Sequence, residues 1–104
     1  MQSTHAVTLE VKGPEHLGLE TRAAFRQEAM ALLSSLPEDG GRLVIDLQAT
    51  RSVDSAGLGV LMLVQRRAAE RNQVVVLHRP NDELRFLLVL TKLDDLFEVE
   101  ADAA

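Results

Sequence analysis

Residues 42–59 read Arg-Leu-Val-Ile-Asp-Leu-Gln-Ala-Thr-Arg-Ser-Val-Asp-Ser-Ala-Gly-Leu-Gly, and an apolar segment follows them. Within this stretch Leu43, Ile45 and Leu47 alternate with other residues, which is the period of a β-strand. From residue 58 onward the apolar residues follow a helical spacing instead. We call the junction between the two periods, residues 53–59, the hinge, and we expect the function of the protein to reside there.

The hinge breaks a local rule of helix formation. Asp54 and Ser55 are good N-cap residues, because a short side-chain oxygen can accept a hydrogen bond from a first-turn N–H. Capping does not explain Gly57 and Gly59, each of which costs roughly 1 kcal/mol in a helix relative to alanine. Glycine leaves the backbone bare, so that either another element of the same fold or another chain can approach closely. Both interpretations remain open from the sequence.

The helix that follows the hinge is apolar all the way round in its first turns, from Leu58 to Val64. Such a helix is either buried on several sides or meets a partner. Charged residues return from Arg66 onward, and basic residues near a helix C-terminus suit the helix dipole. The candidate for an exposed apolar surface is therefore the N-terminal end of this helix, beside Ser55.

The rest of the chain predicts further strands and helices. We expect strands at residues 6–12 and 74–77, the latter covered on both faces, and weaker ones at 16–19 and 93–99. A helix is expected to begin at Glu20 or Thr21, and another after Pro80. Strand, crossover helix and strand in this order favour a parallel, right-handed βαβ unit. The inner faces of these two helices are predicted to hold Phe25, Ala29, Leu32, Leu33 and Leu36 in the first, and Leu84, Leu87 and Leu88, widened by Phe86, Val89 and Leu90, in the second.

Composition narrows the function classes. The 104 residues suffice for one domain, and 46% hydrophobic with 26% charged residues is typical of a globular protein. Because there is no cysteine, no disulfide or thiolate metal site is possible. No apolar run approaches 18 residues and no signal-peptide pattern is present, so we expect a cytoplasmic protein without membrane insertion. A net charge of −5 and only three aromatic residues argue against direct nucleic-acid binding.

Catalytic and cofactor motifs are also lacking. A nucleophile elbow needs Gly-x-Ser-x-Gly, but Val53 stands where the first glycine belongs. His5, His16 and His78 have no motif around them, and neither a dinucleotide fingerprint, a phosphate loop nor metal-ligand spacing occurs. We therefore predict no enzyme, no cofactor and no metal. For Asp46, a carboxylate bonded to nearby backbone is favoured over one that shapes a partner surface.

The sequence Val-Ile-Asp-Leu, a short loop, and then Val-Asp-Ser-Ala-Gly-Leu-Gly-Val-Leu resembles the STAS domain family, most closely the bacterial anti-sigma-factor antagonists. The strand at 74–78 and the segment 91–97, Thr-Lys-Leu-Asp-Asp-Leu-Phe, agree with the resemblance, which covers about residues 20–99. It implies an α/β fold with a central mixed β-sheet of four to five strands and about four helices mainly on one face. The expected organisation is one domain over residues 1–104, with a core at about 6–99 and an acidic tail at 100–104.

The resemblance also implies a partner and a site. The partner is an anti-sigma factor with a kinase-type ATPase domain, and the phosphorylated members of the family carry their phosphate on a second hydroxyl of the hinge. That position is Ala56 here, which leaves Ser55 as at most a secondary phosphorylation site. Asp46 would help to shape the site. The expected partner-binding residues are Asp54, Ser55, Ala56, Gly57, Leu58, Gly59, Leu61 and Met62.

Two alternatives stay open. STAS-like subunits also serve as adaptors on ATPases of lipid-transport systems and as scaffolds in stress signalling, and the absence of a hydroxyl at Ala56 favours such a constitutive role. A third possibility is an antagonist that binds its anti-sigma factor permanently. The exposed apolar helix start is compatible with a monomer or a weak homodimer.

Overall fold

The computed structural model describes residues 7–100, so that His5 and residues 101–104 of the predicted acidic tail lie outside the described residues. Strands and helices follow one another along this part of the chain, and the short strand at residues 52–53 was not predicted from the sequence. The elements are β1 (Thr8–Lys12), β2 (His16–Leu17), α1 (Arg22–Ser35), β3 (Arg42–Asp46), β4 (Ser52–Val53), α2 (Ser55–Glu70), β5 (Val74–His78), α3 (Asp82–Leu90), the 3₁₀-helix η1 (Leu93–Asp95) and β6 (Glu98–Glu100).

The main sheet has four strands in the order β1-β3-β5-β6, and every pairing within it is parallel. The expectation of an α/β fold with four to five strands is confirmed, but the expectation of a mixed sheet is wrong. The reason is the connectivity, since α1, α2 and α3 each lie between consecutive strands of this sheet and return the chain to the same end. The residue range 93–99, expected as a turn and an edge strand, supplies η1 and β6.

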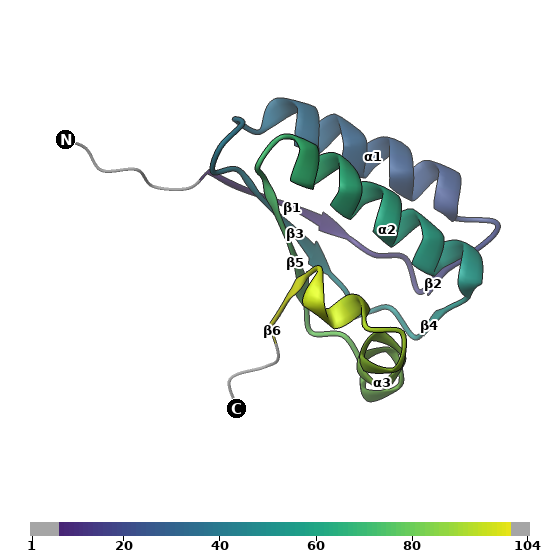
Figure 1. The fold of residues 1–104 in the computed structure, drawn as a ribbon. Helices are drawn as coiled ribbons and strands as arrows, with labels where there is room; N and C mark the ends of the chain where they lie inside the picture. The colour runs from purple at the N-terminus through teal and green to yellow at the C-terminus, as the bar shows by residue number, and fades with distance from the viewer. Residues whose placement is uncertain (1–6, 101–104) are drawn as a thin grey trace.

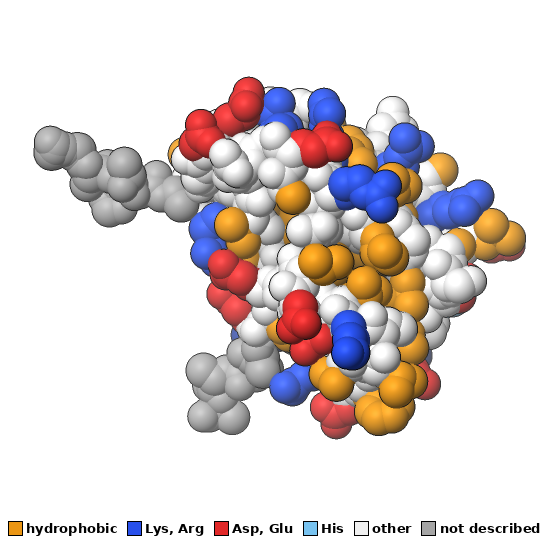
Figure 2. Space-filling view, in the orientation of Figure 1, with side chains coloured by type: hydrophobic (Ala, Val, Ile, Leu, Met, Phe, Trp, Pro, Cys, Tyr) orange, Lys and Arg blue, Asp and Glu red, His pale blue; other side chains and the backbone are white. Residues whose placement is uncertain are grey.

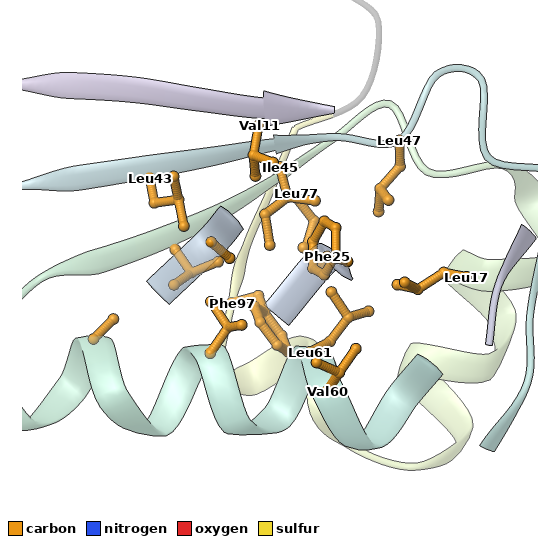
Figure 3. Close-up of a cluster of buried hydrophobic side chains, with 14 of the residues drawn as sticks. Val11, Leu17, Phe25, Leu43, Ile45, Leu47, Val60, Leu61, Leu77 and Phe97 are labelled. Atoms are coloured by element: carbon orange, nitrogen blue, oxygen red, sulfur yellow. The ribbon is translucent and has the colours of Figure 1, made fainter. Parts of the chain in front are cut away.

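Helices α1 and α2 lie side by side across one face of the main sheet, and α3 lies near β4 (Figure 1). The core fills the space between this helical layer and the sheet. Figure 3 shows strand side chains pointing toward Leu61 on α2, with Phe25 of α1 among them. Ile45, at the centre of the sheet, pairs in register with Val11 on one side and Leu77 on the other.

The opposite face of the main sheet carries polar side chains, because strand residues alternate between the two faces. Arg42 on this face lies 3.3 Å from Glu98 and 3.7 Å from Glu100, both on the edge strand β6. Val76, in the centre of β5, is fully buried although it alternates with the core residues Val75 and Leu77. The prediction that β5 is covered on both faces is therefore confirmed at Val76.

The amino ends of β3 and β5 are closed by a buried glutamine. Gln73 precedes β5, and its side-chain Nε2 donates to the carbonyl oxygens of Leu33, Leu36 and Pro37 at 3.0, 3.1 and 3.2 Å. Leu33 lies in the last turn of α1, and Leu36 and Pro37 follow the helix, where C=O groups have no partner within it. One amide group thus ties the end of α1 to the start of β5.

Candidate functional site

The hinge joins β4 to α2, and Asp54 is the N-cap that the sequence predicts. Its Oδ1 accepts a hydrogen bond from the backbone N–H of Gly57 at 2.9 Å, and its Oδ2 accepts one from the N–H of Leu19 at 3.3 Å. The N–H of Gly57 is the main reason why the pKa of the Asp54 carboxyl lies below its usual value. Asp54 therefore presents a negative charge at the start of α2 at neutral pH.

His16 also reaches the hinge, and no pattern in the sequence predicts this contact. Strand β2 pairs with β4 in a second, two-stranded sheet, so that His16 lies opposite Ser52. His16 Nδ1 is 2.5 Å from Ser52 Oγ, and its Nε2 is 3.6 Å from Asp54 Oδ2. A Cβ at Gly18 would collide with both the His16 ring and the Asp54 carboxylate, so glycine at this position leaves room for their approach.

His16 lies between a serine hydroxyl and a carboxylate, as the histidine of a hydrolase triad does. The distances, however, are not those of a triad. The 3.6 Å between His16 Nε2 and Asp54 Oδ2 exceeds hydrogen-bond distance, and backbone N–H groups already engage both carboxylate oxygens. Within residues 7–100 no group of histidines and carboxylates could hold a metal ion. These contacts hold the hinge against β2, and we call the cluster of His16, Ser52 and Asp54 the brace.

The two glycines of the hinge have different environments. A Cβ on Gly57 would collide with the backbone carbonyl of Leu17, and would also come within 2.8 Å of the Val53 side chain. Gly57 is thus the position at which a neighbouring element of the same fold, β2, comes close to α2. Apart from its two chain neighbours and the backbone of its own helix, no atom lies within 4 Å of the position that a Cβ on Gly59 would take, and the residue is exposed. Of the two interpretations left open by the sequence, the structural one applies to Gly57, and Gly59 has open space around it.

The apolar residues of α2 also divide between the core and the surface. Leu61 is 0% exposed and lies in the core, so neither Leu61 nor the buried Gly57 can contact a partner directly in this structure. Met62 is 36% exposed, and the adjacent Leu63, which sequence reasoning did not include, is 43% exposed. The accessible members of the predicted set are Asp54, Ser55, Ala56, Leu58, Gly59 and Met62, of which Asp54, Ala56 and Leu58 are partly buried.

Asp46, at the end of β3, makes a local hydrogen bond. Its Oδ1 accepts a hydrogen bond from the backbone N–H of Gln48 at 3.0 Å, which is the local role that the sequence favoured. His78, at the carboxyl end of β5, has its Nδ1 3.2 Å from Glu100 Oε1 and thus belongs to the sheet edge. Neither residue lines the site described below.

Helix α3 exposes the residues that were expected to widen its inner face. Phe86, Val89 and Leu90 are 69%, 61% and 66% exposed, so this expectation is wrong. The buried positions of α3 are Leu84 and Leu88, one turn apart, and at 100° per residue the other three fall on the opposite side of the helix. Figure 2 shows hydrophobic side chains gathered over the region of α3.

A groove of about 360 Å³ lies between the hinge and α3. It is positioned by the hydrogen bond from Asn81 Nδ2 to the carbonyl oxygen of Arg51, 3.0 Å long, which ties the start of α3 to β4. Its walls come from segments that follow the carboxyl ends of β1, β3 and β5, the edge where open parallel sheets usually bind their ligands. The lining residues are His16, Thr50, Arg51, Ser52, Val53, Asp54, Asn81, Glu83, Leu84, Phe86, Leu87 and Leu90.

Solved structures with the same fold include two proteins named as anti-sigma factor antagonists. TM1081 of Thermotoga maritima superposes with a TM-score of 0.78 at 20% identity, covering 92% of this chain and 80% of that one. SpoIIAA in its unphosphorylated form superposes with a TM-score of 0.67 at 13% identity, covering 99% and 86%. A sulfate transporter family protein from Wolinella succinogenes gives 0.68 at 15% identity, covering 94% and 78%. At such identities the likeness concerns the fold.

No helix in the part of the chain that the structure describes is long and apolar enough to cross a membrane. A sequence search among curated proteins gives no significant match. A family model does match, over residues 2–98, and its description is "Mlab, STAS domain". This match spans the hinge, the groove and all strands of the main sheet except the last residues of β6. The chain therefore belongs to the STAS domain family.

Proposed function

We propose that this chain is an anti-sigma-factor antagonist-like regulator that acts in the cytoplasm by binding a kinase-type anti-sigma factor. The observation that carries the proposal is the open space around Gly59, between the capped start of α2 and the exposed side chains of Met62 and Leu63. Packing within the fold accounts for the residue types at Gly57 and Leu61. It does not account for the glycine at position 59 or for the exposed Met62 and Leu63. A bare backbone beside apolar side chains suits the close approach of another chain.

The proposed contact surface consists of Ser55, Gly59, Met62 and Leu63, with the partly buried Ala56 and Leu58 at its base. These few residues make a small surface beside the roughly 20–30 residues that each partner contributes to a standard protein–protein interface. This size supports a regulated, reversible contact, and the negative charge of Asp54 at its edge adds electrostatic selectivity. The STAS fold shared with two proteins named as anti-sigma factor antagonists is consistent with this role.

The phosphorylation switch of the family would need a different acceptor here. Ala56 carries no hydroxyl, and Ser55 is the exposed hydroxyl beside it, in the first turn of α2. A helix N-terminus accommodates a phosphate, but the ionised Asp54 next to it would repel the added charge of about −2. We expect substoichiometric phosphate on Ser55 after incubation with the cognate kinase, measured by mass spectrometry. Stoichiometric phosphorylation at Ser55 would show that the switch is intact.

A second candidate function is that of a constitutive STAS adaptor on an ATPase complex, such as a lipid-transport system, or of a stress-signalling scaffold. Ala56 favours it, because the hinge keeps its cap and its shape without the acceptor hydroxyl. The similarity in fold to a sulfate transporter family protein indicates that the fold is not confined to antagonists. The two functions differ in the partner that the same surface would bind.

The test is affinity capture from the native organism with Gly59→Arg, which adds a bulky charge at an exposed position with no atom near its Cβ. Leu58 is less suitable, because its side chain packs partly against the core. The matched control is Ala69→Arg, which adds the same side chain at an exposed position on the far end of α2.

We expect wild type and Ala69→Arg to retain an anti-sigma kinase that Gly59→Arg loses, with binding weakened at least tenfold. Retrieval of transporter ATPase subunits with the same dependence on Gly59 would favour the adaptor. If both variants retrieve the same partners as wild type, the proposed contact surface on α2 does not bind them and the proposal is wrong.

A further inference from the structure

We propose that the groove between the hinge and α3 is a second docking site, which takes an amphipathic helix of a partner protein with apolar side chains on one face and a lysine or arginine beside them. The inference rests on the proposed function in that it gives the same regulator a second contact next to the hinge surface. Its occupant is identified by the chemistry of the groove walls.

One wall of the groove is apolar and unusually exposed. Phe86 and Leu90 of α3 are each about two-thirds exposed, and Leu87 between them also lines the groove. Val53 of β4 faces them from the hinge side. A volume of about 360 Å³ falls in the range of well-formed binding pockets and offers space for side chains rather than for a whole domain. An occupant must therefore insert a few apolar side chains.

Two carboxylates give the groove a negative charge. Glu83 lines it and forms no ion pair with any other residue of the described part of the chain. Asp54 lines the opposite wall, and its lowered pKa keeps it ionised. The guanidinium of Arg51, which also lines the groove, lies 3.4 Å from the carboxylate of Glu15, a partner that offsets its charge. A basic residue on the occupant would thus be attracted to Glu83.

A helix fits this wall better than a second copy of the chain or a membrane. Apolar side chains one turn apart, Phe86 and Leu90, suit the i, i+3, i+4 anchors of an amphipathic helix laid in a groove. A two-fold dimer through this face would bring the acidic grooves of two copies together, so that like charges would repel each other. The net charge of −5 likewise disfavours an anionic membrane surface.

The test is selection from a displayed library of random 16-residue peptides on the immobilised wild-type protein, followed by affinity measurements on the enriched peptides. Two pairs of variants locate the binding site. Leu90→Asp changes the groove wall, whereas Val89→Asp changes an equally exposed apolar residue of α3 that does not line it. Glu83→Lys reverses the groove charge, whereas Asp82→Lys reverses its neighbour outside the groove in the same helical turn.

We expect enriched peptides with apolar residues at helical spacing and at least one lysine or arginine. Their affinity should fall at least tenfold with Leu90→Asp and about fivefold with Glu83→Lys, and change less than twofold with the two controls. All four positions are exposed, and circular dichroism confirms that each variant is folded before its affinity is compared.

Peptides without helical spacing, acidic peptides, or peptides that bind Leu90→Asp as well as wild type would overturn the inference. Self-association lost in Leu90→Asp, or binding to vesicles of anionic phospholipid, would assign the groove to a second copy or to a membrane and would overturn it equally. Because the selection needs no native partner, its failure leaves the Gly59→Arg capture experiment unaffected. Conversely, a partner lost only with Gly59→Arg supports the hinge surface by itself.

Discussion

The two ends of the parallel sheet use their polar groups differently. At the amino ends of β3 and β5, Gln73 is 5% exposed and its amide Nε2 binds three carbonyl oxygens at the end of α1 and just after it. At the carboxyl ends, His16 and Asp54 are about half exposed, and beside them a groove separates the hinge from α3. The first end is closed around its polar group, and the second is left open to solvent.

The contrast separates a side chain that the fold needs for its packing from side chains that the fold leaves accessible. The buried Nε2 of Gln73 finds its acceptors at the end of α1, whereas its Oε1 has none, so this side chain holds α1 against β5 through its N–H groups alone. The brace of His16 and Asp54 fixes the start of α2 while keeping charge and apolar surface accessible. Loops at the carboxyl ends of parallel strands are where open α/β sheets bind ligands. The predictions below test this division, beginning with the position at which the open end is most tightly packed.

Gly57→Ala should cause the largest loss of stability. The new methyl group would collide with the backbone carbonyl of Leu17, so that β2 or α2 has to move. Overpacking of this kind costs about 3 kcal/mol at its upper range, more than the roughly 1 kcal/mol that alanine gains over glycine in a helix. Urea unfolding monitored by circular dichroism measures the change as a lower midpoint.

Gly59→Ala is the matched control for this prediction, because it makes the same replacement in open space two residues later. The variant should be more stable than wild type, by up to about 1 kcal/mol, since only the helix propensity changes. A destabilisation at Gly59 equal to that at Gly57 would mean that the hinge has no open side. The comparison of the two ends would then fail.

Gln73→Ala should have the next largest effect, at the closed end. The variant removes the hydrogen bonds that the Gln73 amide donates, each worth about 0.5–1.5 kcal/mol. The carbonyl oxygen of Leu33 keeps the N–H of Leu36 at 3.2 Å, and that of Leu36 keeps Arg71 Nη2 at 3.5 Å. We expect a loss of about 2 kcal/mol in the free energy of unfolding. Affinity for a captured partner should stay within twofold of wild type under native conditions.

A matched control for Gln73 is Asn72→Ala next to it, whose Nδ2 donates at the surface to Asp39 Oδ1 at 2.8 Å. The side-chain bond of Asn72 is exposed to water, so its loss should cost well under 1 kcal/mol. Its backbone lies at φ 54°, which favours glycine or asparagine, and Asn72→Gly separates this conformational contribution. Equal losses at the two positions would contradict the role assigned to burial.

Most of the fold could be predicted from the sequence. The alternation at Leu43, Ile45 and Leu47 and the helical spacing after the hinge are local signals, and both agree with β3 and α2. The parallel direction of every strand follows from the helices between them, once each is recognised as a crossover. The expectation of a mixed sheet was wrong because the weak signal at 93–99 carries no information about strand direction.

The candidate site was less predictable, because its parts meet only through tertiary contacts. His16 lies 36 residues from Ser52 in sequence, and only the pairing of β2 with β4 brings them together. Leu61 and Met62 are both apolar and adjacent, and only the packing of α2 decides that one is buried and the other exposed. In α3 the run Phe86–Leu90 is apolar throughout, so its periodicity does not say which side faces the sheet.

The smallest expected effect is the pH dependence contributed by Asp54. Its carboxyl has a folded-state pKa below the ordinary value of 3.8, so its ionised form stabilises the folded protein above that pH. This contribution is lost as the pH falls through the lowered pKa. Asp54→Asn keeps an oxygen acceptor for the Gly57 N–H but does not titrate. Wild type should therefore be slightly more stable than the variant at pH 6. The difference should begin to fall as the pH approaches 3.8 and should vanish once the pH is below the lowered pKa.

The source of this effect can be located with His16→Gln, which removes the nearby positive charge that His16 carries when protonated. The N–H of Gly57 is a larger cause of the lowered pKa than the charge of His16. The decrease of the stability difference between wild type and Asp54→Asn at low pH should therefore persist when His16 is replaced. Urea midpoints of the four proteins in this double-mutant cycle measure it. If the pH dependence disappeared with His16, the start of α2 would be held mainly by the charge pair between β2 and the hinge, and the open end would depend on its ionisation far more than the closed end does.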